Sequence, residues 1–262
     1  MNLLTSKKQS LKTVVFLLLI LVTHISFSQQ VDSTKTPLYV GGAVNVTNNG
    51  VSLIPSFSLG KPAIMFDLVL GRKKLSFEPQ MRFALEGKPW NFLFWWRYKL
   101  LKTSKWAVNL GTHPAVSFRE RRYVVNGEAI NVTVAQRVLA SEFAPNYSIA
   151  KNVTVGVYYL FAHNFEVDAT QNIHFLALRS NFPAIRLNQQ FVAKVLPQIY
   201  YLNMDGVAGL YANANVTLSK KNCPITLSSI LSKTIKADIA GKEFVWNLSL
   251  TYSFGKNYGE KK

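Results

Sequence analysis

FVWNLSLTYSF, residues 244–254, is the stretch of sequence that decides the fold. Large apolar and aromatic residues, from Phe244 to Phe254, alternate in it with mostly small or polar residues such as Asn247 and Ser249. Successive side chains of a β-strand point to opposite faces, so this repeat of two residues predicts a strand with one apolar face and one polar face.

The same alternation recurs along most of the chain. From Thr36 onward, turn residues separate segments of about ten residues, the length of a strand that crosses a membrane in a barrel. In Leu75–Glu86, for example, Phe77 lies on the apolar face and Arg82 on the polar face. The segments with strand character are 38–47, 51–59, 62–70, 75–86, 90–101, 105–119, 130–150, 153–164, 172–183, 190–202, 206–219, 224–235 and 243–254.

The character of the two faces distinguishes a membrane barrel from a soluble β-sandwich, which also alternates. The apolar faces are large and carry aromatic residues near their ends, as the interfacial girdles of a barrel do. The opposite faces hold mostly Ser, Thr, Asn and Gln, whereas strands that face solvent favour Lys and Glu. These features predict strands with one face in lipid and the other in a wet lumen.

Composition supports a membrane-embedded β-protein. The chain is 48% hydrophobic and only 16% charged, against about a quarter charged in soluble domains. Beyond the N-terminal segment, no apolar run approaches the roughly 20 residues of a membrane-spanning helix. Strands can lie in lipid only if every backbone N–H and C=O is paired, which requires a closed barrel.

The N-terminus has the three parts of a secretory signal peptide. Residues 1–12 are polar and basic, Thr13 to Val22 form an apolar core, and Ser26 and Ser28 are the small residues that precede a cleavage site. We therefore expect residues 1–28 to be removed before Gln29. Residues 29–35 are then a short periplasmic segment.

With this leader and the alternating segments, the terminal strand ending at Phe254 resembles the closing strand of Gram-negative outer-membrane barrels. The resemblance implies an all-β, transmembrane, antiparallel up-and-down barrel over residues 36–254, located in the outer membrane among its lipid and lipopolysaccharide. It covers no function-specific motif. Such barrels usually end at or near the final aromatic residue, whereas a polar tail, residues 255–262, follows here.

The number of strands follows from parity. Thirteen candidate segments conflict with the even number found in bacterial single-chain barrels. The surplus lies around Asn48-Asn49-Gly50, where Asn-Gly signals a hairpin but residues 38–59 could also form one glycine-bent strand. We favour twelve strands, with ten or fourteen as alternatives.

Orientation follows from a periplasmic C-terminus. Counting back from Phe254 then alternates the connections between the two sides of the membrane. The expected outer loops are 236–243, 203–206, 164–171 and 120–128, and the expected inner turns are 220–224, 150–152 and 102–104.

The chain carries a formal net charge of +17, and without leader lysines 7, 8 and 12 the charge is +14. Nucleic acid is excluded as a partner because the chain is exported and its basic residues are scattered. Lipopolysaccharide, small anionic solutes or an acidic partner suit this charge better. The sequence carries no signal for an oligomeric state.

Residues that could carry chemistry form no convincing site. Metal-ligand spacing, a GxSxG motif and a phosphate-binding glycine loop are all absent from the sequence, so no metal or cofactor is expected. His113 and Ser117, with Glu78 or Glu142, faintly resemble the acyl-transfer groups of outer-membrane deacylases and phospholipases. Residues four apart on a strand are separated by roughly 13 Å, too far for a hydrogen bond, which favours lumen filling and predicts no enzyme.

Charged residues on the polar faces are the remaining functional signal. Two interpretations stay open: an excess of cations in a narrow pore favours anions, whereas Arg–Glu pairs cross-link and plug a small barrel. Arg137 is included among these residues although it lies near a suspected bulge around Ala140. The residues expected to line the lumen are Arg82, Arg97, Lys99, Arg137, Arg179 and Lys194, opposed by Glu78, Glu86 and Glu142.

The leading hypothesis is thus a non-enzymatic outer-membrane barrel that acts as a passive pore for small anionic solutes. The alternative is a closed structural or partner-binding barrel that acts through its extracellular loops. A lipid-modifying outer-membrane enzyme is the third and weakest hypothesis.

Overall fold

The structure is a computed structural model that describes residues 36–52, 58–125 and 127–258. The expected signal peptide, the segment 29–35 and the last four residues lie outside this part of the chain. Within it, no helix has the length and apolarity needed to cross a membrane.

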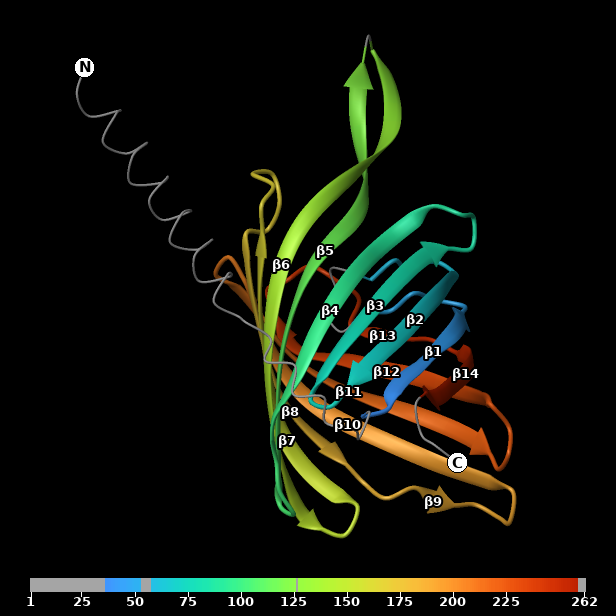
Figure 1. Cartoon of the computed structure of the whole chain (residues 1–262). Coiled ribbons are helices and arrows are strands. Elements are labelled where there is room, and N and C mark those ends of the chain that lie inside the picture. Colours follow the sequence, from blue (N-terminus) through green and yellow to red (C-terminus); the bar gives the residue numbers. More distant parts are fainter. Residues whose placement is uncertain (1–35, 53–57, 126, 259–262) are drawn as a thin grey trace, which may run out of the picture. The chain divides into compact units, whose positions relative to one another are not determined.

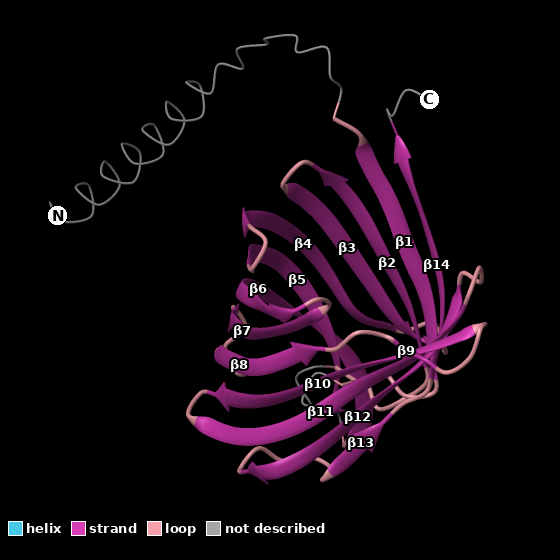
Figure 2. Ribbon diagram, turned by 90° about the horizontal axis from the view of Figure 1, so that it is seen from below, coloured by secondary structure: helices cyan, strands magenta, loops and turns pink. Residues whose placement is uncertain are grey.

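The described residues form one closed antiparallel barrel of twelve strands (Figures 1 and 2). Each strand pairs with its neighbours in the chain, and β1 closes the ring by pairing with the last strand. The strands are β1 (Leu38–Thr47), β2 (Ala63–Arg72), β3 (Leu75–Ala84), β4 (Pro89–Lys102), β5 (Trp106–Val125), β6 (Glu128–Ala150), β7 (Val153–Asn164), β8 (Asn172–Asn181), β10 (Phe191–Met204), β11 (Val207–Lys220), β12 (Ile225–Ala237) and a last strand in two parts, β13 (Phe244–Trp246) and β14 (Ser249–Tyr258). A short additional strand, β9 (Ile185–Arg186), pairs with one end of β10.

The predicted fold class and the predicted number of twelve strands are confirmed. The structure also shows which of the thirteen candidate segments is not a strand. Among its described residues, segment 51–59 contains no strand. The chain turns after Thr47, and the amide of Gly50 donates to the carbonyl of Lys61 (2.8 Å) while Leu59 N–H donates to Gly50 O (2.8 Å). These backbone bonds join the two ends of the loop, and its described residues, 48–52 and 58–62, form neither a separate hairpin strand nor a continuation of β1.

The last strand is longer than expected and is interrupted once. Leu38 pairs with Tyr258, so β1 continues the ladder past Phe254 through residues expected to form a free tail. The interruption falls at Asn247 and Leu248, where side chains replace part of the ladder. Asn247 Oδ1 accepts from Ile230 N–H (2.7 Å), and Asn48 Oδ1 accepts from Leu248 N–H (2.7 Å).

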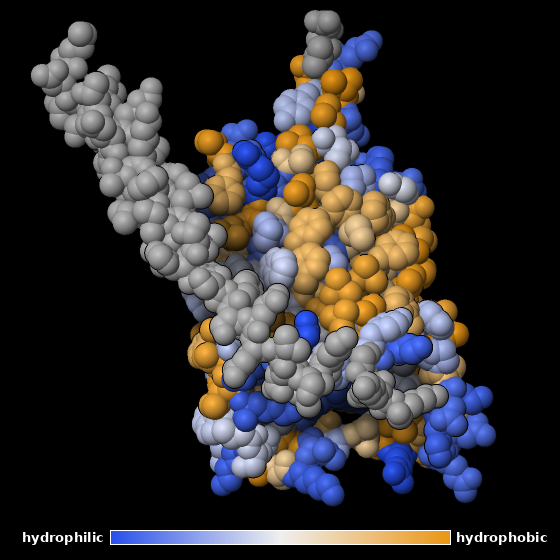
Figure 3. All heavy atoms as spheres, viewed as in Figure 1, coloured by the Kyte–Doolittle hydropathy of each residue, from blue (hydrophilic) through white to orange (hydrophobic). Residues whose placement is uncertain are grey.

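The two faces of the last strand are as the sequence predicts. The six residues of its apolar face, from Phe244 to Phe254, are 44–53% exposed on the outside of the barrel, whereas Asn247 and Ser249 are buried inside. Apolar residues cover much of the outer wall in the same way (Figure 3). An apolar outer surface on a barrel whose charged and amide side chains point inward is the arrangement of a transmembrane barrel.

The connections alternate between two ends of the barrel. One end, here called the terminal end, contains the first residues of β1 and the last of β14; its connections include the β8–β10 segment 182–190, longer than a tight turn. The other, the hairpin end, contains loop 48–62 and the tip of the β5–β6 hairpin, which projects well beyond the other strands (Figure 1).

Charge on the outer wall should be costly. Val157, Leu178 and Ile199 are exposed neighbours in one aliphatic row across β7, β8 and β10. Leu178→Arg should lower the free energy of unfolding in lipid vesicles by roughly 2–4 kcal/mol, the cost of a cation near mid-depth. Leu75→Arg, at the start of a strand beside a turn, is the matched control and should cost roughly 0–1 kcal/mol. Equal costs would contradict the assignment of this wall to lipid.

Candidate functional site

Aromatic side chains fill one side of the barrel interior. Tyr158, Phe175, Tyr200 and Tyr211 come from β7, β8, β10 and β11 and are all buried. Their ring centroids follow one another at 5.9, 4.8 and 4.9 Å, and the last two contacts are stacked. This series narrows the lumen, because its rings pack on one another instead of lining a wide aqueous channel.

An ion-pair network crosses the opposite wall and reaches the aromatic series. Arg97 on β4 is paired with Glu78 of β3 and, through Nε, with Glu142 Oε1 of β6 (2.7 Å). Tyr158 donates its hydroxyl to the other oxygen of Glu142 (2.7 Å). The β5 residue between these strands is Gly111, where an added Cβ would lie only 2.7 Å from Glu142 Oε1. The glycine thus leaves the space that the Glu142 carboxylate occupies.

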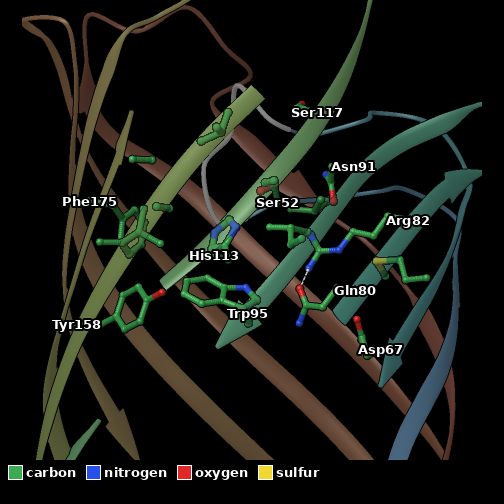
Figure 4. A pocket seen from close by; sticks show the side chains of 18 of the residues that line it. Ser52, Asp67, Gln80, Arg82, Asn91, Trp95, His113, Ser117, Tyr158 and Phe175 are labelled. Atoms are coloured by element: carbon green, nitrogen blue, oxygen red, sulfur yellow. Dashed lines mark hydrogen bonds between the residues drawn. The ribbon is translucent and has the colours of Figure 1, made fainter. Parts of the chain in front are cut away.

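Between these features lies a central cavity of about 480 Å³. One wall, from β2 to β5, is polar and contains Asp67, Arg82 and Asn91. The facing wall is mostly apolar, with Leu160 and Phe175 among its residues. Figure 4 shows Asp67, Gln80, Arg82 and Asn91 on one side of this space and Tyr158 and Phe175 on the other.

A second cavity of about 430 Å³, the basic cavity, lies nearer the terminal end. Arg179 and Lys194 are its charged residues, and no carboxylate is among the residues that line it. The Arg179 guanidinium lies over the ring of Tyr158, 4.8 Å from its centroid. The uncharged polar lining consists of two hydroxyl residues, Thr154 and Ser180, and five amide side chains: Asn146, Asn181, Gln198, Asn213 and Asn215.

At the hairpin end, ion pairs join the loops around a smaller cavity of about 200 Å³. Lys61 of the β1–β2 loop contacts Glu86 (3.3 Å), and Lys88 contacts Glu86 (3.8 Å) and Glu120. The hydrogen bond to Glu120 raises the pKa of Lys88. Exposed pairs of this kind are screened by solvent and contribute little to stability. Glu86 was expected in the lumen but belongs to this exposed rim.

The structure places seven of the nine predicted lumen residues on the inner face: Arg82, Arg97, Lys99, Arg179, Lys194, Glu78 and Glu142. They do not form one site. Glu78, Arg97 and Glu142 bind one another, Arg82 lies on the central cavity, and Arg179 and Lys194 lie on the basic cavity. Lys99 is exposed on the inner face toward the terminal end of β4.

The expectation for Arg137 is wrong. Its neighbours Gln136 and Val138 are buried inside, so Arg137 faces outward, where its Nε donates to Glu166 (2.8 Å). Arg137 was included among the lumen residues although it lies near a suspected bulge around Ala140. β5 and β6 instead pair without a register shift from Trp106↔Tyr147 to Val125↔Glu128.

Sequence reasoning missed two inward charges. Asp67 faces the central cavity, and Arg119 lines the small cavity at the hairpin end. A single carboxylate in the otherwise apolar stretch AIMFDLVLG was a detectable signal for Asp67, because the alternation of β2 places it on the same face as Ala63 and Met65. The alternation of residues 105–119 already puts Arg119 on the polar face with Ser117, but Arg119 was left out of the set of lumen charges.

The possible catalytic residues are used for packing. His113 and Ser117 are both buried, and the imidazole lies against the Trp95 ring with centroids 4.0 Å apart. His113 Nδ1 is 3.4 Å from the carbonyl of Pro114. Among the described residues, no group of three His, Cys, Asp or Glu side chains could hold a metal ion.

Comparison with known proteins gives this chain no family. No family model matches the sequence, and no curated relative matches it. Similar solved structures include the KdgM porin in complex with disordered oligogalacturonate, with 8% identity, 82% of this chain and 99% of that chain covered, and a TM-score of 0.48. An outer-membrane channel of Pseudomonas putida F1 has 10% identity, coverages of 84% and 95%, and a TM-score of 0.48. OmpT, an outer-membrane protein of Vibrio cholerae, has 8% identity, coverages of 83% and 96%, and a TM-score of 0.40.

The network around Arg97 should be needed for stability as a unit. Arg97→Met leaves the buried Glu142 carboxylate without its cation and should cost about 3 kcal/mol, the lower end for a broken buried pair. Adding Glu78→Gln and Glu142→Gln removes the unpaired charges and should recover most of that loss. Urea unfolding in lipid vesicles measures both effects. A triple variant no more stable than Arg97→Met would show that the carboxylates are not the source of the cost.

Proposed function

We propose that this protein is a non-enzymatic barrel of the outer membrane that admits small anionic solutes passively. The observation that carries the proposal is the basic cavity, where Arg179 and Lys194 face the lumen and no lining residue is acidic. Because the outer wall of the barrel faces lipid, a cavity inside it lies within the thickness of the membrane.

The charges of the basic cavity favour anions for a physical reason. Two cations in a narrow space with low-dielectric walls produce a stronger field than the same charges in bulk water. That field raises the local concentration of anions and opposes the entry of cations. The Arg97 network does not add to this field, because its one cation is paired with two carboxylates and the cluster has a formal charge of −1, which partly opposes the field of the basic cavity.

The uncharged lining of the basic cavity suits a solute that loses part of its hydration shell. Each amide side chain supplies two N–H donors and one acceptor. The N–H groups of residues such as Gln198 and Asn213 can replace water around an anion without fixing it tightly. Weak replaceable contacts are what passage requires, because a solute must leave as readily as it enters.

The two large cavities adjoin each other, which supports a path between them. Asn215 and Ile230 belong to the lining of both. A solute that enters from the terminal end would therefore meet Lys194 and Arg179 before it reaches the central cavity.

One observation favours a second candidate function, a closed barrel that binds a partner through its loops. Beyond Ser117 and Val138, the residues of β5 and β6 pair only with each other and no longer with β4 or β7. The hairpin therefore projects with both backbone edges unpaired, and exposed edges of this kind are where another chain can add a strand.

Ion selectivity in a planar bilayer tests the proposal. In a KCl gradient, the purified barrel should give a reversal potential that favours chloride. The preference should be stronger in dilute salt, because the Debye length is about 10 Å at 0.1 M and about 3 Å at 1 M. Arg179→Gln with Lys194→Gln should move the selectivity toward neutral.

The control is Lys256→Gln, which removes a cation from the outer face of β14 near the same end of the barrel and should leave the selectivity unchanged. A cation preference in the unmodified protein would contradict the anion path. A folded protein that carries no current would favour the partner-binding candidate.

A further inference from the structure

Positive charge is distributed unevenly between the two ends of the barrel. Among the described residues, Asp67, Glu78 and Glu142 point into the lumen and every other carboxylate lies at the hairpin end. The terminal end therefore has no described carboxylate to balance its cations, and an exposed basic surface of this kind attracts an anionic partner. Its cations, all exposed, are Arg72, Lys73, Lys74, Lys99, Lys102, Lys105, Lys151, Arg186, Lys220, Lys221 and Lys256.

Three consecutive cations at this end, Arg72, Lys73 and Lys74, lie at the connection between β2 and β3 and are here called the basic turn. Arg72 lies on the outer face, because it pairs with Leu75, whose side chain is 49% exposed on the outer wall. Lys74 Nζ lies over the ring of Tyr98, the next outward residue in this row, 6.0 Å from its centroid. The charge of the basic turn is thus held beside the outer wall and not over the lumen.

The outer wall next to the basic turn is apolar. Leu70 pairs with Phe77 and Phe77 pairs with Trp96, so these side chains form one outward row across β2, β3 and β4, here called the apolar row. The rings of Phe77 and Trp96 are in contact, with centroids 4.6 Å apart, and Trp96 is 47% exposed. Exposed Trp and Tyr residues anchor membrane proteins at the level of the lipid headgroups. The apolar row therefore lies against acyl chains, and the basic turn lies at the level of the headgroups.

A further cation reaches the same row from the last strand. Lys256 pairs with Val40 of β1, and Val40 pairs with Leu70 of the apolar row. Its Nζ lies over the ring of Tyr258, 5.5 Å from the centroid, as Lys74 lies over Tyr98. Cations from two separate elements thus flank one apolar surface, and hydrophilic residues gather along the lower edge of the apolar wall in Figure 3.

The combination of charge and apolar surface defines the ligand. A free anion would gain nothing from the apolar row, and a zwitterionic phospholipid carries a cation of its own that opposes the basic turn. A phospholipid with net negative charge suits both parts, because Arg and Lys attract anionic headgroups while acyl chains cover the wall. The expected orientation puts the terminal end on the periplasmic side, where the leaflet of the outer membrane consists of phospholipid and not lipopolysaccharide.

We propose that the basic turn and the apolar row form a binding site for one anionic phospholipid on the outer wall of the barrel. The lipid phosphate accepts hydrogen bonds from Arg72 and Lys74, and an acyl chain lies along Leu70, Phe77 and Trp96. Arg suits this role because its planar guanidinium matches the geometry of a phosphate. The site is separate from the proposed anion path, because Arg179 and Lys194 face the lumen.

Quenching of tryptophan fluorescence by brominated lipids tests the proposal, because Trp96 belongs to the apolar row. The full barrel is placed in phosphatidylcholine vesicles that contain a small fraction of brominated phosphatidylglycerol, or the same fraction of brominated phosphatidylcholine. Phosphatidylglycerol should bind at least about fivefold more tightly, the preference expected from one Lys or Arg near an anionic surface. Salt should weaken the preference, because the Debye length is about 10 Å at 0.1 M and about 3 Å at 1 M. Equal quenching by the two lipids would overturn the proposal and leave the basic surface to an acidic protein.

Matched double variants assign the binding to the basic turn. Arg72→Gln with Lys74→Gln should lower the preference for phosphatidylglycerol roughly fivefold, whereas the charge-conserving Arg72→Lys with Lys74→Arg should keep most of it. Lys233→Gln with Lys236→Gln removes two outward cations of β12 nearer the hairpin end and should leave the preference unchanged.

Resistance to proteolysis shows that the variants are folded. An unchanged preference in the folded Arg72→Gln, Lys74→Gln barrel would overturn the assignment, and so would an equal loss in the Lys233→Gln, Lys236→Gln control. The quenching measurement requires no current, so its failure and a failure of ion selectivity are separate results.

Discussion

Closure of the hydrogen-bond ladder between β1 and the last strand is the constraint on which the rest of the structure depends. In lipid, a free strand edge would leave a row of backbone groups without partners, at several kcal/mol each. The pairing from Leu38↔Tyr258 to Thr47↔Ser249 removes that edge. It also explains why strand structure continues past Phe254: β1 begins at Leu38, and its first residues need partners as much as its last. Where the ladder is interrupted, at Asn247 and Leu248, amide side chains take over the bonds.

Closure also determines what the interior must contain. Twelve strands enclose more space than backbone can fill, and side chains of alternate residues have to occupy it. On one side, stacked rings such as Tyr200 and Tyr211 fill the space. On the other side, charged groups lie in the interior, and a buried carboxylate such as Glu142 is tolerated because Arg97 and Tyr158 both bind it. The Arg–Glu pairs therefore act as cross-links around Arg97. Nearer the terminal end, in the basic cavity, the cations have no carboxylate beside them.

Most of the fold could be predicted because the alternation of apolar and polar residues is visible in each short segment, and on a strand it determines which side chains face lipid and which face the lumen. The faces of residues 244–254 follow from side-chain direction alone. What failed depended on contacts between distant parts of the chain. Segment 51–59 has strand-like residues, but Gly50 bonds to Lys61 and closes a loop instead. Arg137 was assigned inward near a suspected bulge, but the uninterrupted β5–β6 register keeps the alternation from Glu142 and leaves Arg137 outside. The loop depends on a contact that local sequence does not encode, and for Arg137 the plain alternation was the better guide.

For the candidate site, alternation predicts which face a charged residue lies on, but it does not predict which partners that residue contacts. Parity assigns Arg82, Arg97 and Arg179 to one face, but it treats them as equivalent lumen cations. The structure separates them through partners on other strands: Glu142 neutralises Arg97, Gln80 holds Arg82, and Arg179 lies over Tyr158 without a carboxylate in its cavity. The chemical character of each cavity thus arises from strand neighbours that are up to 45 residues apart in the sequence, as for Arg97 and Glu142. A count of inward cations therefore overstates the field that attracts anions, because Arg97 is outnumbered by its two carboxylates and only the cations without a paired carboxylate favour anions.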